Sequence, residues 1–107
     1  MIVIGIDVGH GGIDSGACFP AAPATPELRE KDIALAVARR LNQAIKGAGW
    51  DATSFLVREE DETTSFDMRR AMLEKYATDF VISIHVNATD PKASNLISFY
   101  KDDESKE

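Results

Sequence analysis

The hydrophobic residues of this chain form two kinds of pattern, short continuous runs and helically spaced positions. The runs at residues 2–7 and 80–84 are rich in β-branched residues and do not alternate with polar ones, which is typical of strands buried on both faces. Residues 52–57 predict another strand, and residues 95–100 predict a fourth. We therefore expect a sheet of several short strands, with the runs at 2–7 and 80–84 in its interior.

A first helix is predicted over residues 30–46, because apolar positions recur there every three or four residues. Gly47 and Gly49 follow this segment and can end the helix as C-terminal capping residues. The preceding stretch, residues 19–26, is rich in proline and alanine and is predicted to be irregular. The apolar face of the helix is predicted to consist of Ile33, Val37, Leu41, Ala44 and Ile45.

A second helix is predicted after an acidic, exposed loop at residues 58–63. Thr64 or Ser65 can cap its N-terminus, and Thr64 and Asp67 have the spacing of a capping-box variant. The residues predicted to face inward from this helix are Phe66, Leu73 and Tyr76.

The order of these elements predicts an α/β fold. Strand, helix, strand, helix, strand is the pattern of right-handed βαβ units, which form a mostly parallel sheet with helices on both faces. A chain of 107 residues is long enough for one core, so we expect a single domain over residues 1–107. In open α/β sheets the ligand binds beyond the carboxyl ends of the strands, so residues directly after strands are candidates for function.

Composition and charge narrow the range of partners. With 44% hydrophobic and 28% charged residues the chain has the composition of a globular protein. Its 18 acidic and 12 basic residues give a net charge of −6, which disfavours nucleic acid and anionic membranes as partners. No apolar run approaches the ~20 residues of a membrane span. The single cysteine, Cys18, cannot form an internal disulfide.

The two histidines of the chain, His10 and His85, each follow a predicted strand directly and should meet at one edge of the sheet. Imidazole is a common zinc ligand, and catalytic zinc needs three protein ligands with one position left for water. Glu30, at the start of the first helix, is a candidate third ligand, although spacing alone favours a simple interaction with the helix dipole. The alternatives for the third position are Asp7, Asp14, Asp32 and Cys18.

The residues around His10 suggest how such a site is shaped. Gly11 and Gly12 suit a backbone that turns sharply behind a metal ligand, because glycine tolerates positive φ angles, although an ordinary glycine-rich turn has the same composition. Asp7 and Asp14 can orient a ligand imidazole as hydrogen-bond acceptors, but capping or surface roles fit them equally well.

Four ordered segments form a recognisable pattern. Residues 3–17 include IGIDVGHGGIDSGA, a strand that runs into a Gly-His-Gly-Gly turn, and EKD follows at residues 30–32. LVR stands at residues 56–58 and FVISIHVNA at residues 80–88. In this order the segments resemble the zinc-dependent N-acetylmuramoyl-L-alanine amidases that cleave bacterial cell wall. They resemble the family's first strand and turn, its second zinc ligand, the end of its second strand and the strand that delivers its third ligand. The resemblance extends from residue 2 to about residue 100.

The resemblance implies that His10, Glu30 and His85 hold Zn²⁺ and that the substrate is peptidoglycan. The implied reaction is metal-assisted hydrolysis of the amide bond between N-acetylmuramic acid and L-alanine of the stem peptide. In the family a later strand supplies a glutamate that acts as general base and acid. The charged residues 101–107 do not match it, so the catalytic residue stays unassigned, and we expect a domain shortened at its C-terminal end.

Two functions from different classes are consistent with this pattern. One is an amidase, and the other is a non-catalytic, zinc-containing module that binds peptidoglycan or regulates its turnover after loss of the general base. A missing last strand would expose a sheet edge, so we also expect self-association. The chain begins with an apolar strand and without a secretory signal, which favours a phage endolysin or a processed fragment over an exported enzyme.

Overall fold

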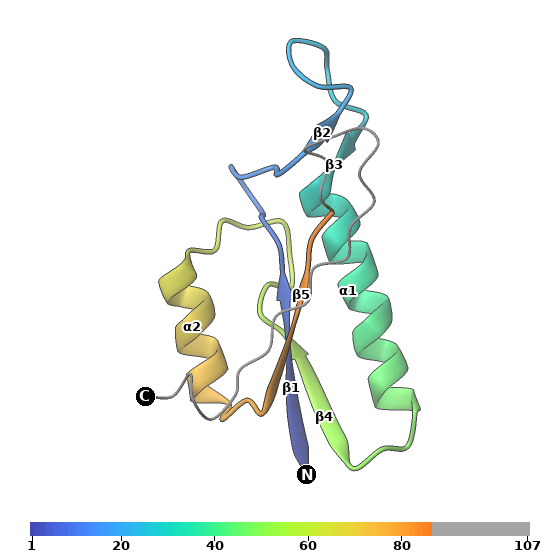
Figure 1. Cartoon of the computed structure of the whole chain (residues 1–107), viewed down its shortest axis with the longest axis vertical. Helices are drawn as coiled ribbons and strands as arrows, with labels where there is room; N and C mark the ends of the chain where they lie inside the picture. Colours follow the sequence, from blue (N-terminus) through green and yellow to red (C-terminus); the bar gives the residue numbers. More distant parts are fainter. Residues whose placement is uncertain (87–107) are drawn as a thin grey trace.

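The structure is a computed structural model, and it describes residues 1–86. The predicted strand at residues 95–100 lies outside this range. Figure 1 shows the elements, which are β1 (Ile2–Val8), β2 (Cys18–Phe19), β3 (Leu28–Arg29), α1 (Glu30–Gly47), β4 (Ala52–Leu56), α2 (Phe66–Lys75) and β5 (Phe80–Ile84). The predictions of both helices and of three strands are therefore confirmed.

The main sheet is parallel and has the strand order β4-β1-β5. Ile6 of β1 lies opposite Leu56 of β4 on one side and Ile82 of β5 on the other. Helix α1 connects β1 to β4, and α2 connects β4 to β5, so the helices lie on opposite faces of the sheet (Figure 1). This arrangement confirms the predicted α/β fold, and it brings the carboxyl ends of all three strands to one edge.

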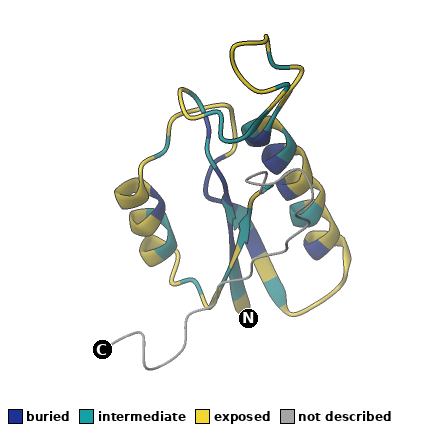
Figure 2. Cartoon of the chain, turned by 45° about the horizontal axis from the view of Figure 1, so that its top comes forward, coloured by how far each residue is buried: buried dark blue, intermediate teal, exposed yellow. Residues whose placement is uncertain are grey.

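The hydrophobic core lies between the sheet and α1. Ile6 and Val8 of β1 are completely buried there, against the small side chains of Ala34 and Ala38 on α1. Figure 2 shows the buried side of α1 turned toward the sheet. The predicted apolar face of α1 was partly wrong, because Val37 and Ala44 are exposed. The alanines occupy the contact because their small side chains let the helix approach the strands closely.

The opposite face of the sheet packs against α2 more sparsely. Ser65 caps α2 by accepting a hydrogen bond from the backbone N–H of Met68 at 3.1 Å, which confirms one of the two predicted caps. The Thr64 hydroxyl donates to the Glu62 carbonyl instead, so the predicted capping box does not form. Phe66 is 89% exposed, and the expectation that it faces inward was wrong. The polar side chain of Arg69 is the buried residue of α2.

Two further differences concern the strands. Phe19 was expected in an irregular segment, but β2 and β3 form a short antiparallel pair that projects beyond the carboxyl edge of the sheet (Figure 1). Strand β5 was expected to be buried on both faces, yet Phe80 is 55% exposed, because β5 has only β1 as a neighbour among residues 1–86. No helix in the described range is long and apolar enough to cross a membrane.

Candidate metal centre

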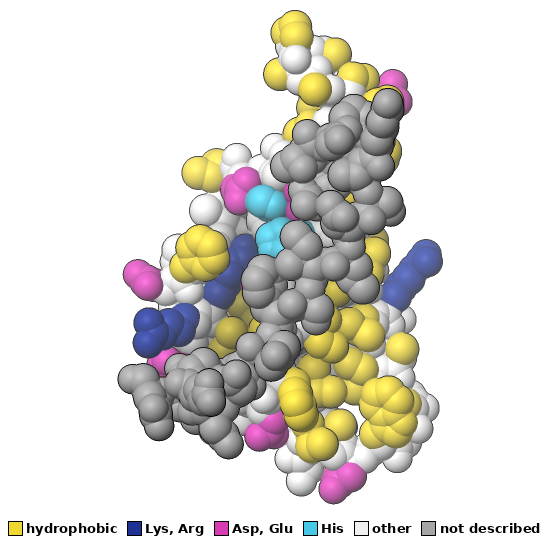
Figure 3. All heavy atoms as spheres, in the orientation of Figure 1, with side chains coloured by type: hydrophobic (Ala, Val, Ile, Leu, Met, Phe, Trp, Pro, Cys, Tyr) yellow, Lys and Arg dark blue, Asp and Glu magenta, His cyan; other side chains and the backbone are white. Residues whose placement is uncertain are grey.

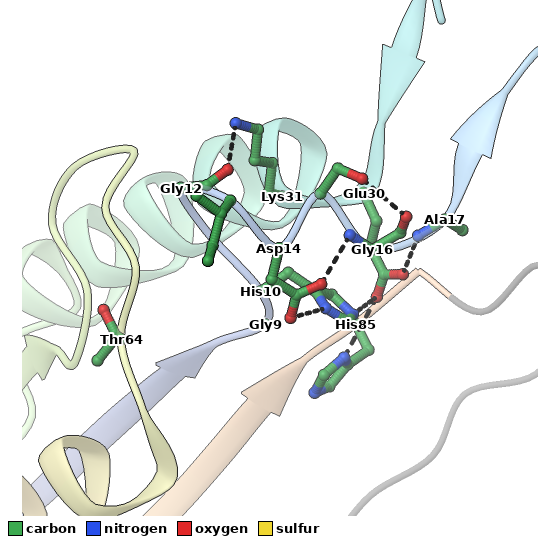
Figure 4. Close-up of polar contacts among 12 residues, drawn as sticks. Gly9, His10, Gly12, Asp14, Gly16, Ala17, Glu30, Lys31, Thr64 and His85 are labelled. Atoms are coloured by element: carbon green, nitrogen blue, oxygen red, sulfur yellow. Dashed lines mark hydrogen bonds and ion pairs between the residues drawn. The ribbon is translucent and has the colours of Figure 1, made fainter. Parts of the chain in front are cut away.

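Three side chains from three separate segments meet at the carboxyl edge of the sheet. His10 lies just beyond β1, Glu30 is the first residue of α1, and His85 follows β5. One potential ligand atom from each of them lies within 4.8 Å of the others. Figure 4 shows these three residues pointing toward one another, and Figure 3 shows both imidazoles at the molecular surface. Among residues 1–86, these three side chains form a group that could hold a metal ion.

The distances from Glu30 to the two histidines suit a small tetrahedral cation. Glu30 Oε2 lies 3.1 Å from His10 Nε2 and 3.2 Å from His85 Nδ1. Two ligands bonded to zinc at 2.0–2.1 Å and at the tetrahedral angle are roughly 3.3 Å apart, close to both values. Two imidazoles and one carboxylate are also ligands that zinc accepts, and three such ligands leave a coordination position open. The residues present therefore fit a zinc ion in their chemistry, and the spacing of Glu30 from each histidine fits as well.

Glu30 is held in place by backbone groups on both of its oxygens. Oε1 accepts a hydrogen bond from Ala17 N at 3.0 Å, and Oε2 accepts one from Val86 N at 2.8 Å. The side chain is only 6% exposed. Burial alone would raise the pKa of Glu30, but the N–H groups of Ala17 and Val86 and the nearby His10 lower it below its ordinary value. The cluster thus contains an ionised carboxylate, the form that binds a metal ion.

The position of Glu30 follows from how α1 begins. Arg29, the residue before the helix, makes no side-chain cap. Instead, the free N–H groups of Glu30 and Lys31 donate to the carbonyls of Ala17 and Ser15, at 2.8 and 3.1 Å. The chain after the His10 turn therefore caps the helix that carries Glu30, which fixes the first and second candidate ligands relative to each other.

His10 is oriented by Asp14. The Asp14 carboxylate lies 2.8 Å from His10 Nδ1, and its other oxygen accepts a hydrogen bond from Gly16 N. The hydrogen bond to His10 lowers the pKa of Asp14. An ionised acceptor at Nδ1 favours the tautomer with its proton on that nitrogen, which leaves the Nε2 lone pair available to bind a metal ion.

The turn behind His10 uses backbone conformations that favour glycine. Gly11 has φ +132° and Gly12 has φ +58°, and His10 itself has φ +61°. A Cβ atom at Gly11 would lie 2.5 Å from Arg58 Cδ, so no larger residue fits there without a shift. The turn is tied to its surroundings by Asp61, which accepts from Gly12 N at 2.8 Å.

The structure keeps the alternative third ligands apart from the cluster. Asp7 pairs with Arg69 at 2.7 Å and accepts from the Ser83 hydroxyl at 2.9 Å. The thiol of Cys18 contacts the hydroxyl of Ser15, and Asp32 is exposed on α1. Asp14 contacts His10 on the ring nitrogen that faces away from Glu30.

Two arginines complete the site, and no pattern in the sequence predicted their role. Arg58 is fully buried, and Arg69 is nearly so. Their guanidinium groups donate to the carbonyls of three successive residues, Val8, Gly9 and His10. In the sequence, Arg58 follows a predicted strand and Arg69 lies in a predicted helix. Neither position by itself distinguishes a buried arginine from a solvated one.

An apolar recess adjoins the cluster. It has a volume of about 470 Å³ and lies between the β2–β3 pair and the beginning of α1. Glu30 and Val86 form part of its wall, so the recess lies directly beside one of the three candidate ligands. Phe19, Leu28 and Ile33 are among the apolar residues that line it.

Fold and site together define a class of protein, a parallel α/β domain with a His-Glu-His cluster at the carboxyl edge of its sheet. Residues 4–107 match the family described as N-acetylmuramoyl-L-alanine amidase, and the chain belongs to this family. This confirms the resemblance noted in the sequence.

Individual relatives agree with the family assignment. The chain is 39% identical over 87 residues to the N-acetylmuramoyl-L-alanine amidase AmiC of Escherichia coli O6:H1, covering 81% of this chain and 19% of that protein. It is 35% identical to the uncharacterised protein YqiI of Bacillus subtilis, covering 92% of this chain and 44% of that one. The catalytic domain of the amidase CwlV from Paenibacillus polymyxa superposes with a TM-score of 0.75 at 28% identity, covering 87% of this chain and 50% of that domain. The chain thus spans about half, or less, of the length of these proteins.

Proposed function

We propose that this chain acts as a zinc-dependent N-acetylmuramoyl-L-alanine amidase on peptidoglycan, with residues 1–107 belonging to one catalytic domain. The observation that carries the proposal is the convergence of His10, Glu30 and His85, whose ligand atoms lie within 4.8 Å of one another. Membership of the amidase family supports the reaction, which is hydrolysis of the amide bond between N-acetylmuramic acid and L-alanine.

His10, Glu30 and His85 would hold the zinc ion. When bound, zinc supplies a Lewis acid for the amide carbonyl and lowers the pKa of a bound water to about 7. The chain's own residues prepare this site. Asp14 keeps the Nε2 lone pair of His10 available, and two backbone N–H groups hold the Glu30 carboxylate in its ionised form. The apolar recess beside Glu30 offers a water-poor surface for the part of the substrate next to the scissile bond.

No residue is proposed as the general base. The absence of a positioned base typically costs about 10²–10⁴-fold in rate, so a chain without one would turn over slowly. The alternative function, a module that binds peptidoglycan without cleaving it, keeps the same three zinc ligands. Measurement of zinc binding therefore cannot distinguish the two functions, whereas measurement of substrate turnover can.

The first test is the zinc content of the purified protein, measured by elemental analysis. We expect one zinc per chain in the wild type and its loss in Glu30→Ala and His85→Ala, because two remaining ligands bind zinc weakly. Asp32→Asn is the matched control, since Asp32 is an exposed carboxylate on the same helix. It should retain the metal. A folded wild-type protein that stays free of zinc after metal is added would refute the proposed site.

The second test is hydrolysis of purified muropeptides, with mass spectrometry of the released stem peptide. We expect peptides with a free N-terminal alanine, and no release by His85→Ala whose fold is verified by circular dichroism. Zinc-loaded protein that sediments with peptidoglycan but releases no peptide would favour the binding module and reject the amidase activity of this chain.

A further inference from the structure

We propose that Arg58 and Arg69 are positioning residues of the metal centre, which join the segments carrying the three ligands through hydrogen bonds to backbone carbonyls. This inference rests on the proposed zinc site and deepens it. According to this inference, two guanidinium groups fix the relative positions of the three ligand segments without contacting the ligand side chains.

Arg58 connects the first ligand segment to the second. Its Nη2 donates to the carbonyl of Gly9 at 2.9 Å and to the carbonyl of Lys31 at 3.0 Å. Gly9 directly precedes His10, and Lys31 directly follows Glu30. One nitrogen therefore links the backbone next to each of these two ligands. Its Nη1 donates to the backbone carbonyl of Glu60, and this bond anchors the guanidinium group to the loop after β4.

Arg69 connects the first ligand segment to the third. Its Nη2 donates to the carbonyl of His10 at 2.8 Å, and its Nη1 lies 2.7 Å from Asp7 Oδ1. The other oxygen of Asp7 accepts a hydrogen bond from the hydroxyl of Ser83 at 2.9 Å. Ser83 lies on β5, two residues before His85. The chain of contacts from Arg69 through Asp7 to Ser83 thus aligns β1 with β5 at the ends that carry the two histidines.

These contacts stabilise a turn whose backbone conformation is unfavourable. His10 has a left-handed φ of +61°, a conformation that is unfavourable for residues other than glycine. The carbonyls of residues 8, 9 and 10 each accept a hydrogen bond from a guanidinium group. A buried carbonyl without a partner is costly, so loss of either arginine would favour rearrangement of the turn.

Arginine is required at these positions for a geometric reason. The guanidinium group is a rigid planar fork with five N–H donors, whereas the lysine ammonium is a point charge on a flexible stem. Arg58 uses its two terminal nitrogens on three carbonyls from three segments. Lysine keeps the charge but cannot reproduce this spread of donors. The variant Arg58→Lys therefore removes the geometry and retains the cation.

The test is the zinc affinity of Arg58→Lys, measured at 25 °C by competition with a chromophoric chelator, with the melting temperature measured separately. We expect an affinity about 10–100-fold weaker than that of the wild type, the usual effect of losing a group that orients metal ligands. Ile45→Ala is the control for instability, because Ile45 is buried near the far end of α1. It should lower the melting temperature and leave the zinc affinity unchanged.

Arg39→Lys is the control for the substitution itself, since Arg39 is a more exposed arginine on α1 that also donates to a backbone carbonyl. It should change neither quantity. If Arg58→Lys does not fold, Ser83→Ala tests the contacts that run from Arg69 through Asp7 to Ser83. For this variant we expect several-fold weaker zinc binding with a nearly unchanged melting temperature. Wild-type affinity in Arg58→Lys, or in Ser83→Ala when only that variant folds, overturns the inference and leaves the zinc site intact. A wild-type protein without zinc affinity refutes the proposed site itself.

Discussion

At the scale of single residues, the candidate metal centre depends on groups that are not ligands. Two of the three candidate ligand side chains have a partner outside the cluster that restricts their orientation. Glu30 is held by two backbone N–H groups, and His10 is held by a carboxylate. Such partners lower the entropy lost on metal binding, because the ligands are already close to their bound positions.

Asp14→Asn tests this arrangement for His10. The amide can still accept a hydrogen bond, but it carries no charge to favour the proton on His10 Nδ1. We expect zinc affinity to fall by about 10–100-fold while the melting temperature of the metal-free protein changes little. Affinity is measured by chelator competition. Asp67→Asn on α2 serves as the control, and equal affinity in Asp14→Asn and wild type would exclude an orienting role for Asp14.

At the scale of elements, short connections place the ligands, and helical propensity contributes less. The acidic loop after β4 contacts both the glycine turn and the beginning of α1. Lys31 Nζ donates to Asp61 at 2.9 Å and to the carbonyl of Gly12 at 3.0 Å. Asp61 in turn accepts from Gly12 N. One carboxylate and one ammonium group therefore hold three segments together beside the metal centre.

This contact predicts a pH dependence of stability. The Lys31 ammonium and the N–H of Gly12 lower the pKa of Asp61 below its ordinary value of 3.8. A carboxyl group whose pKa is lower in the folded state stabilises the protein above the unfolded value, and this contribution is lost as the pH falls through the folded pKa. Asp61→Asn should therefore melt at a lower temperature than wild type at pH 7 and lose less stability between pH 5 and pH 2.

Thermal melts at several pH values measure this difference. Asp61 is exposed, so the effect should be small and should decrease as salt is added. Asp32→Asn is the control. Parallel pH profiles of the wild type and Asp61→Asn would show that the contact contributes nothing to folding.

At the scale of the whole molecule, the described part of the chain has one well-covered face and one open edge. The core against α1 buries Ile6 and Val8 completely, whereas Phe80 and Ile82 on β5 retain much of their exposure. Exposed apolar side chains on an edge strand favour association with another chain.

Self-association of the purified chain therefore stays a prediction. We expect the mass measured by light scattering to increase with protein concentration, and Phe80→Lys to reduce this increase by placing a charge on the exposed face of β5. Circular dichroism verifies the fold of the variant. A monomeric mass for the wild type at high concentration would contradict the prediction.

The sequence predicted most of the secondary-structure elements of this fold, but it predicted their packing less well. Continuous apolar runs and helical spacing are local properties, so the order of the main-sheet strands and the two helices could be deduced correctly. The inward face of α1 could not, because Val37 and Ala34 are both apolar and only the distance to the sheet selects the smaller one. Phe66 was misplaced for a related reason. A large apolar residue at a helix start is expected to be buried, but in α2 the buried residue is Arg69.

The sequence by itself therefore determined that two histidines follow strands and meet at one edge of a parallel α/β sheet. Spacing left the third member of the cluster open, and only the resemblance to a family implied Glu30. The tertiary structure decided which carboxylate joins the histidines, because the contact of Glu30 with His85 spans 55 positions. It also decided that Arg58 binds Gly9 across 49 positions. Contacts at such separations depend on how complete elements pack, and no local pattern encodes them.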